Sequence, residues 1–196
     1  MHPEVLKLGI YKYDIRKLSD DEYNKWFSLM SEEKQAKVNR FYFDDDRKRT
    51  VAGEMLARKA VAKRCGVSEE SIVFGKNENG KPFAQNLDVQ FNISHSEDMV
   101  VCVVADNPVG IDVEKIRQID LKVAKRVYTQ DEIDYLYGGD ETAILERFFE
   151  LWTAKEAYLK FLGCGIVDKL NEMYVNTENV LVQKDGEYII SIYSEK

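Results

Sequence analysis

The sequence of 196 residues predicts a mixed α+β fold built in two halves. Apolar runs bounded by turn residues predict strands in both halves. Segments with capping residues and helical periodicity predict helices in both halves. The pair Asn107–Pro108 breaks the chain between two strong strand signals, so we place a domain boundary there. The expected domains are residues 1–107 and 108–196.

The first half begins with a strand pattern, followed by three helices. Alternating apolar residues in VLKLGIYKYDI predict the strand. Ser19 and Ser31 each precede acidic residues, which predicts two helix starts. A longer helix is expected from about Asp44 to Cys65, with Gly66 ending it. Its inward face is expected to consist of Val51, Met55, Leu56 and Ala60.

Shorter signals complete the first half. SIVFG predicts a short strand, and NENGKP predicts a turn through its Asn-Gly and Pro. VQFNIS and MVVCVVA are strong strand patterns that are joined by the polar stretch HSED.

The second half opens with the strand pattern VGIDVEKI. Thr129 and Glu132 form a capping box that starts a short helix. Asp140 is expected to cap a long helix through about Leu162, which Gly163 and Gly165 end. The tail MYVNTENVLVQKDGEYIISIYSEK predicts strands around an Asp-Gly turn.

Composition restricts the possible classes of protein. Cys65, Cys102 and Cys164 lack metal-ligand spacing, and so sparse a set of cysteines indicates reduced thiols in the cytoplasm. The sequence has no apolar run of about 18 residues, so we expect no membrane contact. With two histidines, a His-rich metal site is excluded.

Charge is unevenly distributed along the chain. The net charge is −7, but residues 34–64 hold ten Lys or Arg against four Asp or Glu, a local excess of +6. Such a block indicates either an anionic ligand or partner on one side of the molecule, or a solvated helix face.

Two carboxylates alternate with apolar residues in GIDVEKI. In a strand, Ile111 and Val113 point to one face, and Asp112 and Glu114 point to the other. Such a pair either faces water or holds a cation.

Glu156 breaks an apolar stripe. On a helical wheel, Phe148, Phe149, Trp152 and Leu159 share one face, and Glu156 falls in its middle. An unpaired buried carboxylate is costly, so Glu156 needs a partner. An ion pair with Lys160, one turn later, would explain the spacing but not the position on the stripe.

If that helix packs on the sheet, the three carboxylates converge. They could share protons, or they could bind a hard cation such as Mg²⁺, which takes oxygen ligands and often completes its shell with phosphate. Lys160 at the edge of this face, with Lys155 at its flank, could then neutralise a leaving oxygen, or it could simply be solvated.

Further polar residues could serve the same anion. Lys81 follows a tight turn, and Ser94 and His95 stand at a strand end. A structural role for His95 is the alternative. Arg49 belongs to a cationic run, and Lys34 and Lys37 lie one turn apart upstream.

These residues carry a family resemblance. The chain resembles the two-lobed 4′-phosphopantetheinyl transferases that activate nonribosomal peptide synthetases. The matching segments cover about residues 31–170 in the order of the family, and the pair of motifs GIDVE and WTAKEAYLK is specific at this separation. The segments are RFYFDDDRKRTVAGEMLAR, GKPF, FNISHS, VGIDVEKIR and FFELWTAKEAYLKFLGCGI.

The resemblance implies a fold and a reaction. It implies two pseudo-symmetric lobes, each a small, mostly antiparallel sheet packed by helices, with the active site in the cleft between them. A serine of an apo acyl or peptidyl carrier protein would attack the β-phosphate of coenzyme A. The holo carrier and adenosine 3′,5′-bisphosphate would be the products. We expect a cytoplasmic monomer that binds neither nucleic acid nor membrane.

The resemblance also implies roles for single residues. Asp112, Glu114 and Glu156 would be ligands of Mg²⁺, Glu156 would also be the base, and Lys160 would assist the leaving group. Glu132 is either a further acidic residue near the metal or only a capping-box residue. The remaining coenzyme A contacts would come from Arg49, Lys81, Ser94, His95, Lys155 and Lys160, with Lys34 and Lys37 as further candidates.

Two other functions fit parts of the pattern. A Mg²⁺-dependent nuclease uses Glu and Lys two residues apart on a strand, whereas the spacing here is four, on a predicted helix. A non-catalytic coenzyme A-binding module would lack a metal ligand, and none is missing. The chain also stops after YIISIYSEK, where larger relatives continue with another strand.

Overall fold

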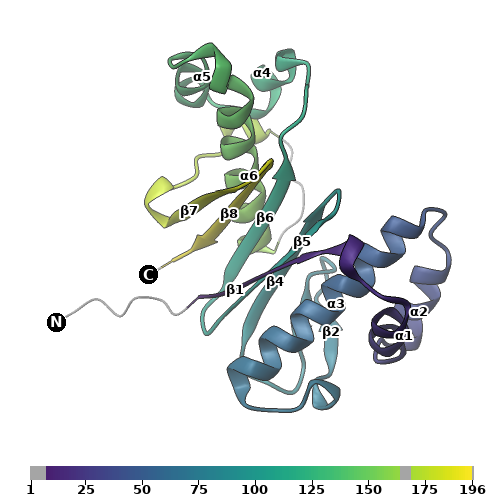
Figure 1. The fold of residues 1–196 in the computed structure, drawn as a ribbon. Helices are drawn as coiled ribbons and strands as arrows, with labels where there is room; N and C mark the ends of the chain where they lie inside the picture. Colours follow the sequence, from purple (N-terminus) through teal and green to yellow (C-terminus); the bar gives the residue numbers. More distant parts are fainter. Residues whose placement is uncertain (1–7, 164–168, 196) are drawn as a thin grey trace.

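We analysed a computed structural model, which describes residues 8–163 and 169–195. The described chain forms two lobes that each contain an antiparallel sheet and a long helix (Figure 1). The α+β fold with two sheet-containing lobes is therefore confirmed. The predicted division at residues 107 and 108 falls in the turn between β5 and β6 and stays a prediction.

The first lobe is built on the sheet β1-β5-β4. Its strands are β1 (Gly9–Asp14), β4 (Gln90–Ser96) and β5 (Met99–Ala105), and β5 pairs with both neighbours in antiparallel register. The long helix α3 (Asp44–Cys65) lies across one face of this sheet (Figure 1). Gly66 ends α3 in the left-handed conformation, as the sequence predicts.

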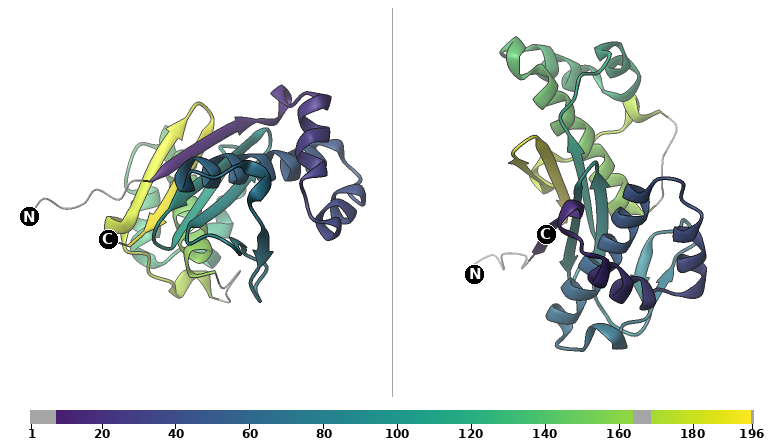
Figure 2. Two further views of the ribbon diagram at one scale, coloured as in Figure 1. Left: turned by 90° about the horizontal axis from the view of Figure 1, so that it is seen from below. Right: turned by 45° about the vertical axis from the view of Figure 1, so that its right-hand side comes forward.

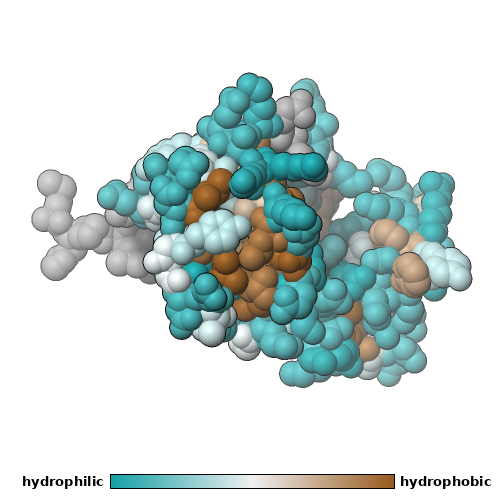
Figure 3. Space-filling view, turned by 90° about the horizontal axis from the view of Figure 1, so that it is seen from above, coloured by the Kyte–Doolittle hydropathy of each residue, from teal (hydrophilic) through white to brown (hydrophobic). Residues whose placement is uncertain are grey.

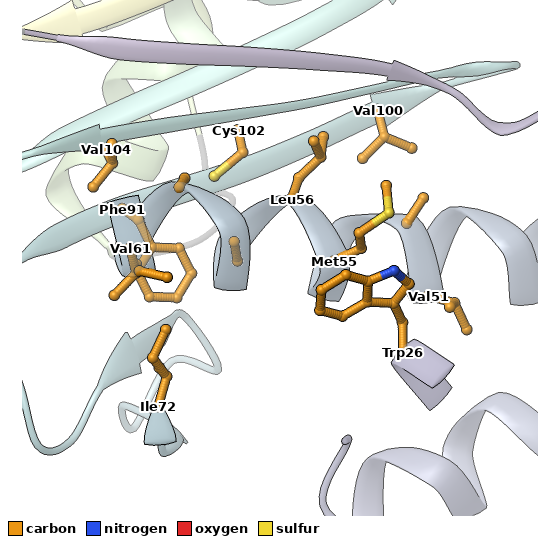
Figure 4. Packing of buried hydrophobic residues seen from close by; sticks show 14 of the residues in the cluster. Trp26, Val51, Met55, Leu56, Val61, Ile72, Phe91, Val100, Cys102 and Val104 are labelled. Atoms are coloured by element: carbon orange, nitrogen blue, oxygen red, sulfur yellow. The ribbon is translucent and has the colours of Figure 1, made fainter. Parts of the chain in front are cut away.

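The core of this lobe lies between α3 and the sheet. Met55 and Leu56 of α3 face Val100 and Cys102 of β5, and Trp26 closes the other side of the helix (Figure 4). All four predicted inward residues of α3 are buried, namely Val51, Met55, Leu56 and Ala60. The burial of these apolar side chains is the main term that stabilises the lobe.

Two short helices and a small hairpin complete the first lobe. Ser19 caps α1 (Asp20–Ser28), and Ser31 caps α2 (Glu32–Asn39), each by accepting a backbone N–H bond. The hairpin β2-β3 joins β2 (Phe74–Lys76) to β3 (Pro82–Ala84). Its turn contains Gly80 at φ 82°, a conformation that favours glycine.

The second lobe is built on the sheet β6-β8-β7. Its strands are β6 (Val109–Lys115), β7 (Val180–Asp185) and β8 (Tyr188–Ser194). The long helix α6 (Ile144–Leu162) packs on one face, and α4 (Ala124–Val127) and α5 (Gln130–Tyr137) lie beyond its N-terminal part. The 3₁₀ turns of the two lobes are Ile15–Lys17, Glu69–Ser71, Leu121–Val123, Glu141–Ala143, Leu170–Glu172 and Thr177–Asn179.

The lobes join through the second face of β5. Val101 and Val103 point away from α3 and pack against Ile111 of β6 and Ile192 of β8 in a separate core cluster. The two sheets therefore lie against each other, as the turned views of Figure 2 show. Because β5 has an apolar core on each face, its sequence reads as a continuous apolar run.

Most predicted elements are confirmed, with four differences. The first strand begins within the described residues at Gly9 and ends at Asp14. SIVFG contributes only its end to a strand, since β2 starts at Phe74. Asp140 caps the 3₁₀ turn before α6 rather than α6 itself, because that turn precedes the helix. His95 and Ser96 continue β4 instead of forming a loop. Cys164 and Gly165 lie outside the described residues.

The face of the molecule that Figure 3 shows is mostly hydrophilic. Among the described residues, no helix is long and apolar enough to cross a membrane. Figure 3 shows an apolar area inside a hydrophilic rim on the second lobe. Several side chains of that lobe's core are only partly buried, among them Ile133 and Ile144.

Candidate active site

The carboxylates of β6 face α6, as the strand alternation predicts. Asp112 and Glu114 lie on this face, whereas Ile111 and Val113 enter the core between the sheets. Gly110 lies on the α6 face too, where an added Cβ would stand 2.0 Å from the carbonyl oxygen of Ala157. The absence of a side chain at Gly110 therefore allows α6 to approach β6 closely.

Lys160 of α6 reaches across this contact. Its Nζ lies 2.6 Å from Asp112 Oδ1 and 2.8 Å from Ser94 Oγ. Ser94 Oγ also donates to Asp112 Oδ1 at 2.7 Å. Lys160 thus pairs with Asp112, and among the described residues no ion pair joins it to Glu156.

Glu156 is half-buried and lines a pocket of about 250 Å³ together with Lys81, Asn92 and Lys160. No hydrogen bond or ion pair within the described chain holds its carboxylate. Burial raises the pKa of Glu156 first, and the negative charges of Asp112 and Glu114 raise it further, against the opposing charge of Lys160. The three carboxylates are therefore electrostatic neighbours.

The donor set fits a hard divalent cation. Asp112 Oδ2 is buried and is the one such side-chain oxygen or nitrogen in the described residues that has no hydrogen-bond partner. Burial raises the pKa of Asp112, and the charge of Lys160 opposes this increase. A cation would satisfy the free oxygen and relieve the repulsion. Within residues 8–163 and 169–195, however, no three acidic, His or Cys side chains are already close enough to hold a metal.

Glu114 is held from two sides. Ser96 Oγ donates to Glu114 Oε2 at 2.8 Å, and Arg117 Nη1 donates to the same oxygen at 3.0 Å. Glu114 Oε1 has no such bond among the described residues. Glu114 Oε1 is therefore available to bind a ligand.

Arg49 and His95 are the two candidate ligand-binding residues near the end of β4 in the first lobe. Arg49 donates to the Glu97 carbonyl oxygen at 2.9 Å and to Asp46 at 2.7 Å. His95 is exposed at the end of β4, but the protein around it removes enough water to lower its pKa. The charges of Arg49 and Lys160 lower this pKa further. Arg49 and Lys160 are thus electrostatic neighbours of His95, and the predicted contacts of Arg49 and His95 with coenzyme A stay a prediction.

Lys81 lines the same pocket but is engaged by the protein. Its Nζ donates to the Lys160 carbonyl oxygen at 2.6 Å and to the Val109 carbonyl oxygen at 3.3 Å. Loss of solvation lowers the pKa of Lys81. Beside it, Asn79 Nδ2 donates to the Gly163 carbonyl oxygen at 2.8 Å. The β2-β3 turn thus holds the C-terminal end of α6.

Lys34 and Lys37 do not line the pocket of Glu156. Lys34 pairs with the buried Glu54 at 2.6 Å and lines a second pocket, of about 480 Å³, in the first lobe. Lys37 lies over the ring of Phe41, with its Nζ 6.0 Å from the centroid. The second pocket shares Pro82 with the pocket of Glu156, so the two are neighbours.

The buried position of Lys155 contradicts the prediction that this residue contacts coenzyme A. Its side chain is only 2% exposed, and its Nζ lies 2.9 Å from Glu132 Oε2 and donates to the carbonyl oxygens of Leu170 and Met173. With three protein partners in a buried position, Lys155 supports the chain rather than contacting coenzyme A. Glu132 closes the capping box with Thr129, so the capping reading of Glu132 is confirmed.

The sequence patterns do not single out four residues that shape the site, namely Asn79, Ser96, Gly110 and Arg117. For Ser96 a signal was present, since Asn92, Ser94 and Ser96 alternate on one face of a strand. A run of polar residues on one face indicates that this face meets polar groups. Which groups it meets depends on how the lobes pack.

Comparisons with known proteins agree with this geometry. Residues 17–107 match the family model described as 4′-phosphopantetheinyl transferase, N-terminal, and residues 108–193 match the 4′-phosphopantetheinyl transferase superfamily. The chain is 37% identical over 174 residues to the 4′-phosphopantetheinyl transferase gsp of Aneurinibacillus migulanus, covering 87% of this chain and 73% of that protein. It is 34% identical over 185 residues to the transferase Sfp of Bacillus subtilis, covering 94% and 80%.

A solved structure gives a weaker likeness. A holo-(acyl-carrier-protein) synthase from Bacillus anthracis, crystallised with coenzyme A (3′,5′-ADP), matches 50% of this chain and 91% of its own at 21% identity. The TM-score of 0.41 is too low to carry a conclusion.

Proposed function

The chain belongs to the 4′-phosphopantetheinyl transferases, and we propose that it transfers the phosphopantetheine arm of coenzyme A to a serine of an apo acyl or peptidyl carrier protein, with Mg²⁺ as cofactor and adenosine 3′,5′-bisphosphate as the second product. The unpartnered, buried Oδ2 of Asp112 is the observation that carries the metal part of this proposal. It lies beside two further carboxylates and several cations, which suits a metal-bound diphosphate.

The metal would be held by Asp112, Glu114 and Glu156. When bound, Mg²⁺ would neutralise charge on the diphosphate and make its β-phosphorus more electrophilic. Glu156, which lines the pocket beside Lys160, accepts the proton of the carrier serine as the general base. Lys160 then offers a positive charge, and a proton, to the leaving phosphate oxygen.

The cations of the first lobe would orient the substrate. Arg49 and His95 lie on the first-lobe side of the carboxylates and would contact the nucleotide phosphates. Lys81 would exchange a carbonyl partner for phosphate, and Lys34 and Lys37 would hold the more distant part of the nucleotide. The hydroxyl of Ser94 already donates its proton to Asp112, so Ser94 would contribute to the site by holding that carboxylate.

We further propose a cytoplasmic monomer. The pocket of Glu156 is lined from both lobes of one chain, by Lys81 and Asn92 of the first lobe and by Glu156 and Lys160 of the second. A second copy of the chain is therefore unnecessary for a complete site.

The test is a transfer assay. The purified protein is incubated with an apo carrier protein, coenzyme A and Mg²⁺, and the carrier is weighed by mass spectrometry. We expect the mass of one phosphopantetheine arm to be added. Chelation of Mg²⁺ by EDTA, or a carrier with its acceptor serine changed to alanine, should abolish the increase. No added mass on several acyl and peptidyl carriers would refute the proposal.

A further inference from the structure

Strands β4 and β6 run side by side at the junction of the lobes without a backbone ladder between them. Side chains of β4 instead accept the backbone N–H groups of β6. Asn92 Oδ1 accepts from Ile111 at 2.9 Å, Ser94 Oγ from Val113 at 3.4 Å, and Ser96 Oγ from Lys115 at 3.2 Å. We call this set of three contacts the seam.

The seam serines perform a second task. Ser94 donates its hydroxyl proton to Asp112 at 2.7 Å, and Ser96 donates to Glu114 at 2.8 Å. Each serine therefore accepts an N–H from one residue of β6 and donates to the carboxylate of the residue before it. A hydroxyl has one proton to donate and lone pairs to accept, so both tasks fit the same oxygen.

The seam serines bind only one oxygen of each carboxylate. Ser94 and Lys160 both contact Asp112 Oδ1, which leaves Oδ2 without a partner. Ser96 and Arg117 both contact Glu114 Oε2, which leaves Oε1 without a hydrogen bond among the described residues. The same division at two successive carboxylates indicates that the hydroxyls hold each group in one orientation, with one oxygen turned away from β4.

We infer that Ser96 is a positioning residue that orients Glu114 for the cation, and that Ser94 does the same for Asp112. This inference rests on the proposed function, because it concerns the Mg²⁺ site of the same reaction. Groups that orient a metal ligand by hydrogen bonding change metal affinity about 10- to 100-fold when removed. Since Arg117 also holds Glu114 Oε2, we expect the lower end of that range for Ser96.

The experiment measures Mn²⁺, as a spectroscopic substitute for Mg²⁺, in the presence of saturating coenzyme A. The dissociation constant is obtained from the electron paramagnetic resonance signal of free Mn²⁺, and the melting temperature is recorded for each variant. We expect Ser96→Ala to bind Mn²⁺ about tenfold more weakly.

A second pair of variants covers the possibility that Ser96→Ala fails to fold. Ser96→Thr and Ser96→Val have the same shape, and only threonine keeps the hydroxyl. We expect threonine to restore Mn²⁺ affinity and valine to reproduce the loss. Equal affinity of the threonine and valine variants would overturn the inference. A wild-type protein that binds no Mn²⁺ with coenzyme A would overturn the proposed metal site itself.

Discussion

Glu156 illustrates how a single side chain can be placed at a cost to stability. Its carboxylate is half-buried beside Asp112 and Glu114 and lacks a protein partner within the described chain. Burial and like charges both favour its neutral form, which is why its pKa is raised above the ordinary 4.5. An ionised Glu156 therefore destabilises the folded protein relative to a neutral residue at the same position.

We predict that Glu156→Gln lowers turnover and raises the stability of the metal-free protein. Loss of a ligand and base should lower turnover at least about 10²-fold at saturating Mg²⁺. Because the pKa of Glu156 is higher in the folded state, its stabilising effect is complete below the unfolded value of 4.5 and is lost as pH rises through the folded value.

The melting temperature in EDTA checks the second part. The variant should exceed the wild type at neutral pH, and the two should converge below pH 4.5. A variant that melts far lower than the wild type and turns over normally would make Glu156 a structural residue.

Arg49 of α3 donates to the Glu97 carbonyl oxygen and to Asp46, and it is a proposed contact of the nucleotide. We predict that Arg49→Ala weakens coenzyme A binding by about 1–3 kcal/mol, as for a lost charge-assisted contact. Isothermal titration calorimetry measures the change. Lys48→Ala is the matched control, because it removes the same charge one residue earlier on α3, where Lys48 pairs with Asp44. Equal affinities for the Arg49 variant and the wild type would remove Arg49 from the site.

At the scale of elements, the approach of α6 to β6 sets the geometry of the site. Gly110 faces the backbone of Ala157 and Phe161, so α6 rests directly on β6 at this point. Glu156 and Lys160 flank this contact along the helix. The distance of both side chains from Asp112 therefore depends on a residue that has no side chain.

We predict that Gly110→Ala destabilises the protein by about 1–3 kcal/mol, because the added methyl group would overlap backbone atoms that cannot rotate away. Mn²⁺ affinity should fall as well, since α6 must move outward. Urea unfolding and Mn²⁺ titration measure the two effects. Gly53→Ala is the control, because the nearest atom to an added Cβ there is Cγ2 of Ile93 at 3.4 Å, an ordinary van der Waals distance. A Gly110 variant as stable as the wild type would show that α6 does not rest on that residue.

At the scale of the whole molecule, positive and negative charges are unevenly distributed along the chain. The net charge is −7, yet residues 34–64 carry an excess of +6. This excess already counts Glu54, which pairs with both Lys34 and Arg58 inside the first lobe. The net positive charge of the block attracts a negatively charged partner.

We predict that an acidic carrier protein docks with electrostatic assistance. The Michaelis constant for the carrier should then rise with salt, because screening weakens charge attraction. The measurement varies the carrier concentration from low to high salt, with coenzyme A kept saturating at each step. A constant that does not change with salt would exclude electrostatic docking.

Local sequence determined most of the elements and the faces of the carboxylates. Ser19, Ser31 and Gly66 mark helix ends because capping depends on neighbours in the chain. Asp112 and Glu114 share a face because side chains alternate along any strand. These properties need no knowledge of the tertiary fold.

The tertiary structure alone decided which partner each polar group takes. Lys155 and Lys160 lie on the same helix, yet one is buried against Glu132 and the other reaches Asp112. Their surroundings come from segments far away in the chain, so local periodicity cannot separate them. The seam follows the same rule, because Ser96 meets Glu114 only where the two lobes pack together. Contacts between distant segments depend on how the elements pack, and that packing is a property of the whole chain.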